Sequence, residues 1–182
     1  MFPPQRWIVL SVDEETFPDG RWGHRPGPLV FKPIEALIAS RFGSWCFRTL
    51  RPLDRRLLSR TKGRYTVFGP IGAPLLLLTT TGKLSGQRRQ SPLTFQREGD
   101  RLYIIGSNFG QAMHPAWSSN LMADRQAWVT ISGEEIPVLA TPLVDAERER
   151  VLAMFADDIP TVYRSYTGRT DRQMRIFALT KR

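Results

Sequence analysis

Hydrophobic positions follow two different periods along the chain, and they predict helices first and strands afterwards. From Pro33 to Trp45, apolar residues recur every three or four positions, as on one face of a helix. Pro33 suits the first turn of such a helix, because proline has no N–H to donate there. We expect Pro52 to break the pattern and a second, short helix to follow around Leu57 and Leu58.

After residue 74 the pattern changes to short runs that are typical of strands. Residues 75–78 are four consecutive leucines, as in a strand buried on both faces. Residues 89–97 and 101–107 flank Glu98-Gly99-Asp100, and alternating residues flank Ser132-Gly133, so two β-hairpins are expected. A last strand is expected over residues 174–179.

Two helices are expected among these strands. One begins at His114-Pro115 and runs through Leu121, and another runs to about Ala156 with Asp145 as its N-cap. Helices and mostly antiparallel strands in this order indicate an α+β fold, a small barrel closed by flanking helices.

Proline, glycine and charge divide the chain into three parts. Residues 1–30 are rich in proline and glycine and are expected to form an irregular N-terminal extension. Residues 31–64 form a basic amphipathic helical arm, and residues 65–182 form the barrel domain. The basic face of the arm fits three roles, which are a solvated helix face, contact with an anionic membrane, and a lid over a ligand.

The charge balance favours anionic partners without choosing among them. The chain has 26 Lys and Arg against 17 Asp and Glu, a net charge of +9. Its only cysteine, Cys46, excludes an intramolecular disulfide and a thiolate zinc site, and two histidines exclude a histidine-rich metal site, so no metal is expected. No segment resembles a signal peptide or a membrane span, so we expect a cytoplasmic protein, with contact to the inner membrane face through residues 32–64 left open.

The loop that follows the leucine run contains the groups that capture anions. Two glycines allow backbone N–H groups to approach an oxyanion, and arginine offers a bidentate fork to phosphate or carboxylate. The spacing is not that of a Walker A motif, and a polar hairpin loop is the alternative. The candidate ligands in this loop are Lys83, Ser85, Gly86, Arg88 and Arg89.

A second loop, residues 106–113, lies between a strand and the helix expected at His114. Its small residues would admit a flat ring, Ser107 and Asn108 could bond the polar edge of that ring, and the helix N-terminus adds a positive dipole. The alternative is that Gly106 and Gly110 only permit a turn. His114 suits a capping role, and one histidine here does not define a Ser-His-Asp triad.

These two loops carry a resemblance to a known family. The blocks Leu77 to Gly86, Ser91-Pro92-Leu93, Gly106-Ser107-Asn108 and His114-Pro115-Ala116-Trp117 occur in the order seen in the deazaflavin-dependent nitroreductase family. The similarity covers about residues 75–179, including Arg169-Thr170-Asp171-Arg172. It implies a split β-barrel of the FMN-binding type and a cofactor-binding domain over residues 65–182. The implied cofactor is coenzyme F-420, a deazaflavin with a phosphate and a polyglutamate tail.

The resemblance also implies roles for individual residues. The first loop would hold the phosphate and the tail, and the second would surround the ring. Leu84 replaces a usual basic residue and Phe109 a frequent glycine, so tail contacts and pocket shape are expected to differ from those of the family. The resemblance implies that Ser91, Pro92 and Leu93 line the barrel side of the cofactor site. The residues implied around the ring are Gly106, Ser107, Asn108, Phe109, Gly110, His114 and Trp117, the last of which also fits a core position.

The implied activity is hydride transfer from the reduced deazaflavin to a small acceptor such as a quinone or nitroaromatic. The cofactor supplies the chemistry, and the protein supplies position and electrostatics. Tyr163, Tyr166 and Ser107 are the implied catalytic residues, with plain packing as the alternative for the tyrosines. A further tyrosine of the family is Pro160 here, so activation of nitro drugs is not assumed.

Other functions fit the same residues. An FMN-binding split-barrel oxidoreductase would use a similar phosphate loop. A non-enzymatic basic β-barrel could bind nucleic acid through Trp22, Trp45 and Trp128, although no aromatics interleave with the densest basic segment, so nucleic acid is not expected. Cofactor sequestration without turnover and pairing into a homodimer stay open.

Overall fold

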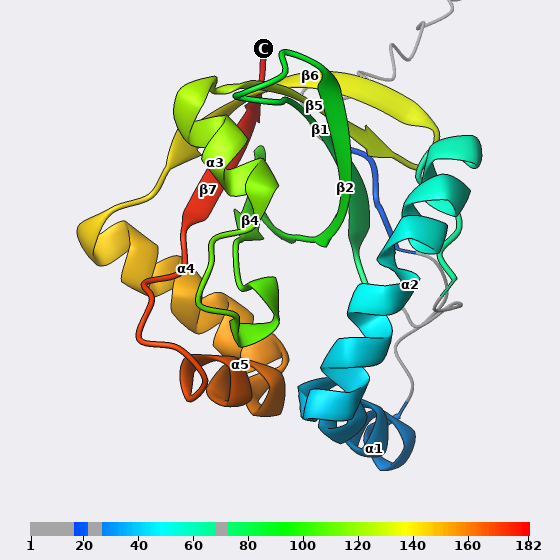
Figure 1. Ribbon diagram of the computed structural model, residues 1–182, viewed down its shortest axis with the longest axis vertical. Helices are drawn as coiled ribbons and strands as arrows, with labels where there is room; N and C mark the ends of the chain where they lie inside the picture. Colours follow the sequence, from blue (N-terminus) through cyan, green and yellow to red (C-terminus); the bar gives the residue numbers. More distant parts are fainter. Residues whose placement is uncertain (1–16, 22–26, 68–72) are drawn as a thin grey trace, which may run out of the picture.

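The computed structural model describes residues 17–21, 27–67 and 73–182 (Figure 1). The predicted extension over residues 1–30 lies mostly outside these residues, as does Trp22. In the described part, no helix combines the length and the apolar character needed to cross a membrane.

One seven-stranded sheet forms the body of the molecule. The strand order is β2-β1-β5-β6-β7-β4-β3, and each neighbouring pair is antiparallel. The sheet curls into a half-barrel with helices around it (Figure 1), which confirms the α+β class and the split barrel. The strands are β1 (Leu75–Thr81), β2 (Arg88–Thr94), β3 (Gln96–Glu98), β4 (Arg101–Ile105), β5 (Gln126–Ile131), β6 (Glu134–Pro142) and β7 (Ile176–Lys181).

The first predicted hairpin is partly wrong. The single strand expected over residues 89–97 is broken at Phe95 into β2, which pairs with β1, and β3, which pairs with β4. The side chain of Phe95 is buried in the barrel core, so the chain turns there to keep the ring inside. The turn at Glu98-Gly99-Asp100 and the second hairpin, β5 with β6, are confirmed.

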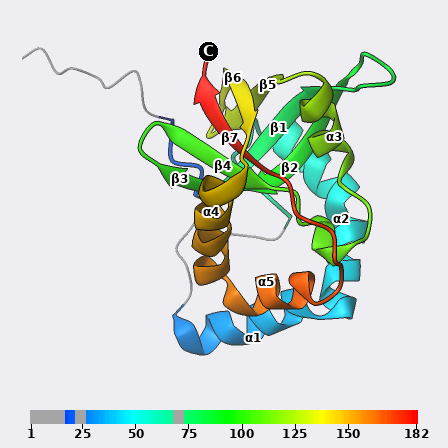
Figure 2. The ribbon, with the colours of Figure 1, turned by 90° about the vertical axis from the view of Figure 1, so that its left-hand side faces the viewer.

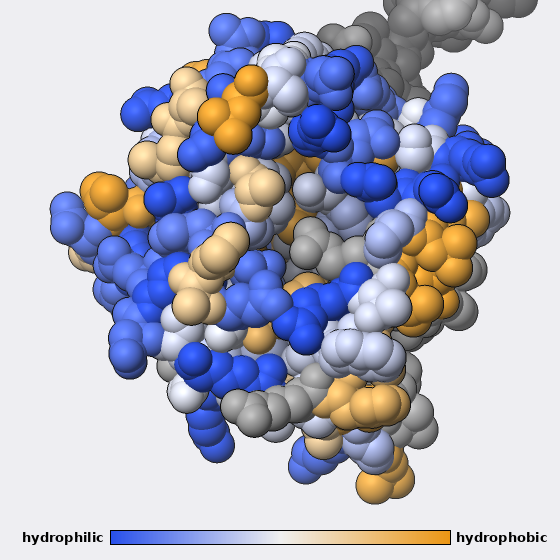
Figure 3. All heavy atoms as spheres, in the orientation of Figure 1, coloured by the Kyte–Doolittle hydropathy of each residue, from blue (hydrophilic) through white to orange (hydrophobic). Residues whose placement is uncertain are grey.

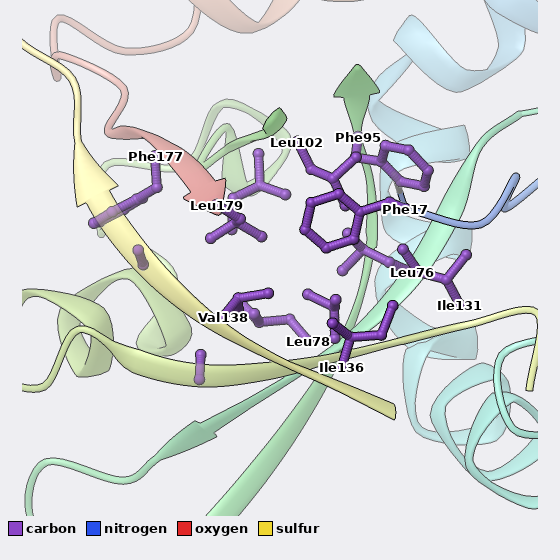
Figure 4. Packing of buried hydrophobic residues seen from close by; sticks show 14 of the residues in the cluster. Phe17, Leu76, Leu78, Phe95, Leu102, Ile131, Ile136, Val138, Phe177 and Leu179 are labelled. Carbon is purple, nitrogen blue, oxygen red and sulfur yellow. The ribbon is translucent and has the colours of Figure 1, made fainter. Parts of the chain in front are cut away.

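The barrel core lies on the concave side of the sheet. Leu76 and Leu78 of β1 pack there with Phe95, Leu102 and Phe177 (Figure 4). Because successive side chains of a strand point to opposite faces, every second residue of β1 lines this interior. The continuous leucine run of β1 is explained by burial on both faces, since α2 lies over β1 and β2 from outside.

The helical arm has two long helices, but the predicted break is wrong. Helix α1 (Pro28–Ala39) and helix α2 (Arg41–Arg60) separate at Ser40, and Pro52 lies inside α2. The Ser40 hydroxyl accepts a hydrogen bond from Gly43 N at 2.9 Å and so caps α2. Burial of Leu58, which is 1% exposed, helps α2 tolerate a proline that costs an isolated helix about 3 kcal/mol.

The remaining helices are α3 (Ala116–Ala123), α4 (Asp145–Asp158) and α5 (Pro160–Thr167). Asp145 is not the cap of α4, because it is the first helical residue and Val144 takes the cap position without a side-chain bond. Helix α5 was not expected, since its eight residues are too few to show a clear period. It packs between α1 and α4, and Figure 2 shows α1 and α5 side by side.

Candidate functional site

Helix α3 connects the two loops that the sequence singles out. The buried side chain of Asn120 donates to Thr80 Oγ1 at 3.0 Å and accepts from Lys83 N at 3.1 Å. This fixes the loop after β1 against the middle of α3, while residues 106–115 lead directly into its first turn. The structure therefore brings both loops to one helix, on a face where hydrophilic side chains surround a hollow (Figure 3).

The first loop is a tight turn closed by glycine. Gly82 N donates to Gln87 O at 2.8 Å, and Gly86 N donates to Gly82 O at 2.7 Å. Gly86 has a φ of +65° and nothing lies within 4 Å of a Cβ placed there, so the turn is open to solvent. The side chains of Lys83 and Ser85 are exposed on it, and Ser85 Oγ accepts long hydrogen bonds from Gln87 N and Arg89 Nη2, both at 3.4 Å.

Strand alternation divides the predicted ligands of β2 between two faces. Leu93 packs against the barrel core, so Ser91 and Arg89, at two-residue steps from it, share the interior face. Arg88 lies on the outer face, where it bonds Glu135 at 3.0 Å and covers the ring of Trp128 at 4.5 Å. Pro92 shares the outer face.

The second loop has an unusual backbone. Ser107 is in the right-handed helical region, whereas Asn108 and Phe109 have φ values of +46° and +56°. Asparagine tolerates this conformation well, and its amide here bonds within the loop, to Met113 O at 2.9 Å. Gly110, at φ +73°, completes the turn. The change of helical hand between Ser107 and Asn108 turns neighbouring N–H groups toward one concave side.

Arg172 holds this loop by its carbonyl groups, a role that the sequence does not predict. Its guanidinium donates to Gln111 O at 3.2 Å, Gly106 O at 3.1 Å and Ser107 O at 3.0 Å. It also contacts His114 Nδ1 at 3.0 Å. The segment 169–172 belongs to the resemblance, but only the fold shows that its last arginine reaches a loop more than sixty residues earlier.

His114 lies in a positive field. Burial is the main cause that lowers its pKa, and the charges of Arg175 and Arg172 lower it further. The lowered pKa favours the neutral form of the imidazole at pH 7. A positive field at this loop suits an anionic ligand.

The aromatic candidates are placed in different surroundings. Tyr166 is 4% exposed and meets the ring of Phe109 edge-on, with 6.1 Å between the centroids. Burial raises the pKa of the Tyr166 hydroxyl, which stays protonated. Trp117 is 3% exposed and packs on Phe177 in the barrel core. Tyr163 lies in α5, but its side chain is outside the part of the chain that the structure describes.

Comparison with known proteins identifies the family. The family model described as F420H(2)-dependent quinone reductase matches residues 52–181. The chain belongs to this family. A protein of this name from Mycobacterium tuberculosis is 32% identical over 124 residues, which are 67% of this chain and 83% of the relative. A Mycobacterium bovis protein with the corresponding name aligns equally well.

Two solved structures are similar to the chain. A structure of an F420-H2 dependent reductase, FDR-A, has a TM-score of 0.53 and 31% identity, and the match covers 58% of this chain and 93% of that one. A second structure, described as a domain-swapped dimer, has a TM-score of 0.55 and 28% identity, over 73% of this chain and 98% of that one.

Membership in the quinone reductase family decides between the functions that the sequence left open. The chain is a deazaflavin-dependent reductase and its cofactor is coenzyme F-420, as predicted, rather than FMN. A non-enzymatic nucleic-acid-binding barrel is not supported. The family match begins at residue 52, so α1 and more than half of α2 lie outside it.

Proposed function

We propose that the chain reduces a small quinone with reduced coenzyme F-420, whose ring lies on the loop of residues 106–114 and whose anionic tail lies on the loop of residues 82–89. The observation that carries this assignment is the junction at Asn120, which ties the two loops to one helix. A ligand with a flat ring and a long acidic tail needs two such sites at a fixed separation.

The residues present fit this cofactor. Lys83, Ser85 and Arg89 offer a cation, a hydroxyl and a bidentate fork to the phosphate and carboxylates, and Gly86 leaves its backbone accessible. Arg88 serves better as an outer-face partner of Glu135, because its guanidinium is already engaged there. The ring site offers backbone N–H groups and the Ser107 hydroxyl within a positive field.

When bound, the reduced cofactor supplies a hydride, and with one proton the quinone becomes a hydroquinone. The chain's part is to hold the acceptor flat against the ring, with reacting atoms about 3 to 3.5 Å apart. In this proposal Tyr163 and Tyr166 wall the acceptor, and Ser107 bonds an oxygen of the acceptor or the ring. A nitroaromatic of similar size fits the same arrangement as a second acceptor.

Three finer points belong to the same proposal. One relative is described as a domain-swapped dimer, which supports a homodimer for this chain. Contact of residues 32–64 with an anionic membrane stays a prediction, as does the cytoplasmic location. The arm does expose Phe42 and Trp45, whose rings stack at 6.2 Å.

A binding titration tests the proposal. Purified protein is titrated with the deazaflavin and, separately, with FMN, at low and high salt, and turnover is followed with a menadione-like quinone. We expect tighter binding of the deazaflavin, weakened by salt because the tail contacts are ionic. Failure of the deazaflavin to bind at low salt would sink the proposal.

Variants separate the assigned roles. Arg89→Gln should weaken the deazaflavin complex by about tenfold, the effect of one lost ionic contact. Arg88→Gln is the matched control, with the same loss of charge one residue away on the outer face, and should change affinity much less. If Tyr163→Phe with Tyr166→Phe leaves both kcat and KM unchanged, the tyrosine roles are wrong while cofactor binding stands.

A further inference from the structure

Arg172 uses its guanidinium on a single target, the loop that precedes α3. Three of its four contacts are to backbone carbonyls, those of Gly106, Ser107 and Gln111, at 3.0 to 3.2 Å. Arginine is suited to this because its donors are spread around a rigid plane. Within the described residues, Arg172 has no ion-pair partner, so its guanidinium is directed at three carbonyl oxygens and at the ring nitrogen of His114.

These contacts also fix the direction of the N–H group in each of the three peptide units. The described chain has no cis peptide bond, so the N–H that follows each carbonyl points the other way. The N–H groups of Ser107, Asn108 and Ala112 therefore point away from Arg172. None of the three has a protein acceptor in the described part of the chain, which leaves them as donors for a ligand.

The fourth contact determines the state of His114. A guanidinium donates and never accepts, so Nδ1 of His114 must carry a lone pair where it meets Arg172 Nη1 at 3.0 Å. The ring is then neutral and carries its only proton on Nε2. Within the described residues that Nε2–H has no acceptor, so it is a fourth donor on this loop.

We propose that Arg172 is a positioning residue of the cofactor site. It turns three loop carbonyls toward its own guanidinium and holds His114 as the Nε2–H tautomer. The loop then offers a ligand four neutral N–H donors, the complement of the carbonyl oxygens of a deazaflavin or quinone. This rests on the proposed function for the identity of the ligand, but the orientation of the loop and the tautomer do not depend on it.

The tautomer is tested directly in a protein whose Arg172 and His114 are unchanged. The chain has only two histidines, so ¹⁵N-histidine labelling with His24→Gln leaves one ring in the NMR spectrum. We expect the His114 signals of a neutral ring protonated at Nε2 at pH 7.5. A ring protonated at Nδ1 overturns the proposal, and this readout needs neither cofactor nor turnover.

Cofactor affinity tests the positioning. Arg172→Gln should weaken deazaflavin binding by about tenfold or more and let His114 populate both tautomers. Arg175→Gln is the matched control, because it also removes a cation near His114. The guanidinium of Arg175 bonds Ser119 Oγ at 3.4 Å and bonds no loop carbonyl. It should change affinity by less than about threefold.

The remaining outcomes are also decisive. Arg172→Lys keeps the charge but not the fork, so it should restore only part of the affinity. Equal losses for Arg172→Gln and Arg175→Gln would show that only charge matters and overturn the positioning role. If Arg172→Gln does not fold, as judged by thermal unfolding, Arg172→Lys and the His114 tautomer of the His24→Gln protein decide. If wild type binds no deazaflavin, the proposed function fails, whereas an Nε2–H ring would still support the orientation by Arg172.

Discussion

The buried carboxylate of Glu35 accepts a hydrogen bond from Thr161 N at 2.8 Å, so that α1 caps the N-terminus of α5. Nearby, Ser165 Oγ donates to Ala39 O at 2.9 Å, and Arg169 donates to the same carbonyl. Helix α1 lies outside the region matched by the family, whereas α5 carries both candidate tyrosines. The arm thus supports the wall proposed for the acceptor.

Replacing Glu35 tests this support. Glu35→Ala leaves the Thr161 N–H without its acceptor and removes a negative charge from a helix N-terminus, so it should lower the free energy of unfolding by about 1–3 kcal/mol. Chemical denaturation measures this. Glu134→Ala, at an exposed strand end, should stay within about 0.5 kcal/mol of wild type. Equal effects of the two variants would show that the cap contributes nothing specific.

The lowered pKa of His114 predicts how stability changes with pH. Between its lowered pKa and the ordinary value of 6.5, the unfolded chain binds more protons at this site than the folded one. Stability therefore rises with pH through this window and is fully present above it. Arg172 and Arg175 are the charges that oppose protonation.

Thermal unfolding at a series of pH values checks this dependence. His114→Gln should flatten the loss of stability below pH 6.5, while His24→Gln serves as the histidine control. A wild-type protein whose stability is constant from pH 7 to 5, or equal effects of the two substitutions, would contradict the assignment.

Asn120 is expected to matter for stability and for the tail site together. Asn120→Ala leaves the Lys83 N–H without its acceptor and removes the bond that Thr80 Oγ1 accepts, which should cost about 1–3 kcal/mol. Because the first loop then loses its tie to α3, deazaflavin affinity should also fall. Ser119→Ala, on the same helix, is the control for both measurements. Loss of stability with unchanged affinity would show that the tie does not shape the tail site.

Substitution of two glycines compares backbone strain alone with backbone strain plus steric contact of the added Cβ. Gly86 and Gly110 both have positive φ, so alanine at either position should cost about 1–2 kcal/mol. At Gly110 the added Cβ would also lie 3.0 Å from Tyr166 O and 3.1 Å from Arg169 Cβ, whereas at Gly86 it would meet nothing. Denaturation should therefore show Gly110→Ala to be the more destabilising, and the reverse order would contradict the packing of η1 (Asn108–Gly110) on α5.

Local signals predicted the strands well and the helix boundaries less well. The leucine run and the glycine turns are read from neighbouring residues, and β1, β5, β6 and the turn before β4 follow from them. The break at Ser40 and the continuation through Pro52 depend on packing of α2 over the sheet, which no local pattern reports. The corner at Phe95 has the same cause, since only the closed core decides where that ring is buried.

The candidate site was predictable where the chain itself is chemically unusual. The glycines of both loops and the cations of the first loop stand out in the sequence. Other features depend on long-range contacts. Asn120 connects the two loops, Arg88 and Arg89 lie on opposite faces of β2, and Arg172 bonds a loop that is distant in sequence. In the sequence, Arg172 cannot be told apart from a solvated surface cation, and only the fold shows its bonds to the loop carbonyls.

The strand order also constrains how the molecule can assemble. Strand β7 lies between β6 and β4, although it is the last strand of the chain. Until β7 has been synthesised, β2-β1-β5-β6 and β4-β3 are two separate ribbons, joined through the chain at Phe95 and through residues 106–125, which contain α3. Such non-local pairing slows folding. The sheet can be completed only after the residues of β7 have left the ribosome. A truncation before Ile176 should leave two unjoined edges and an aggregation-prone product.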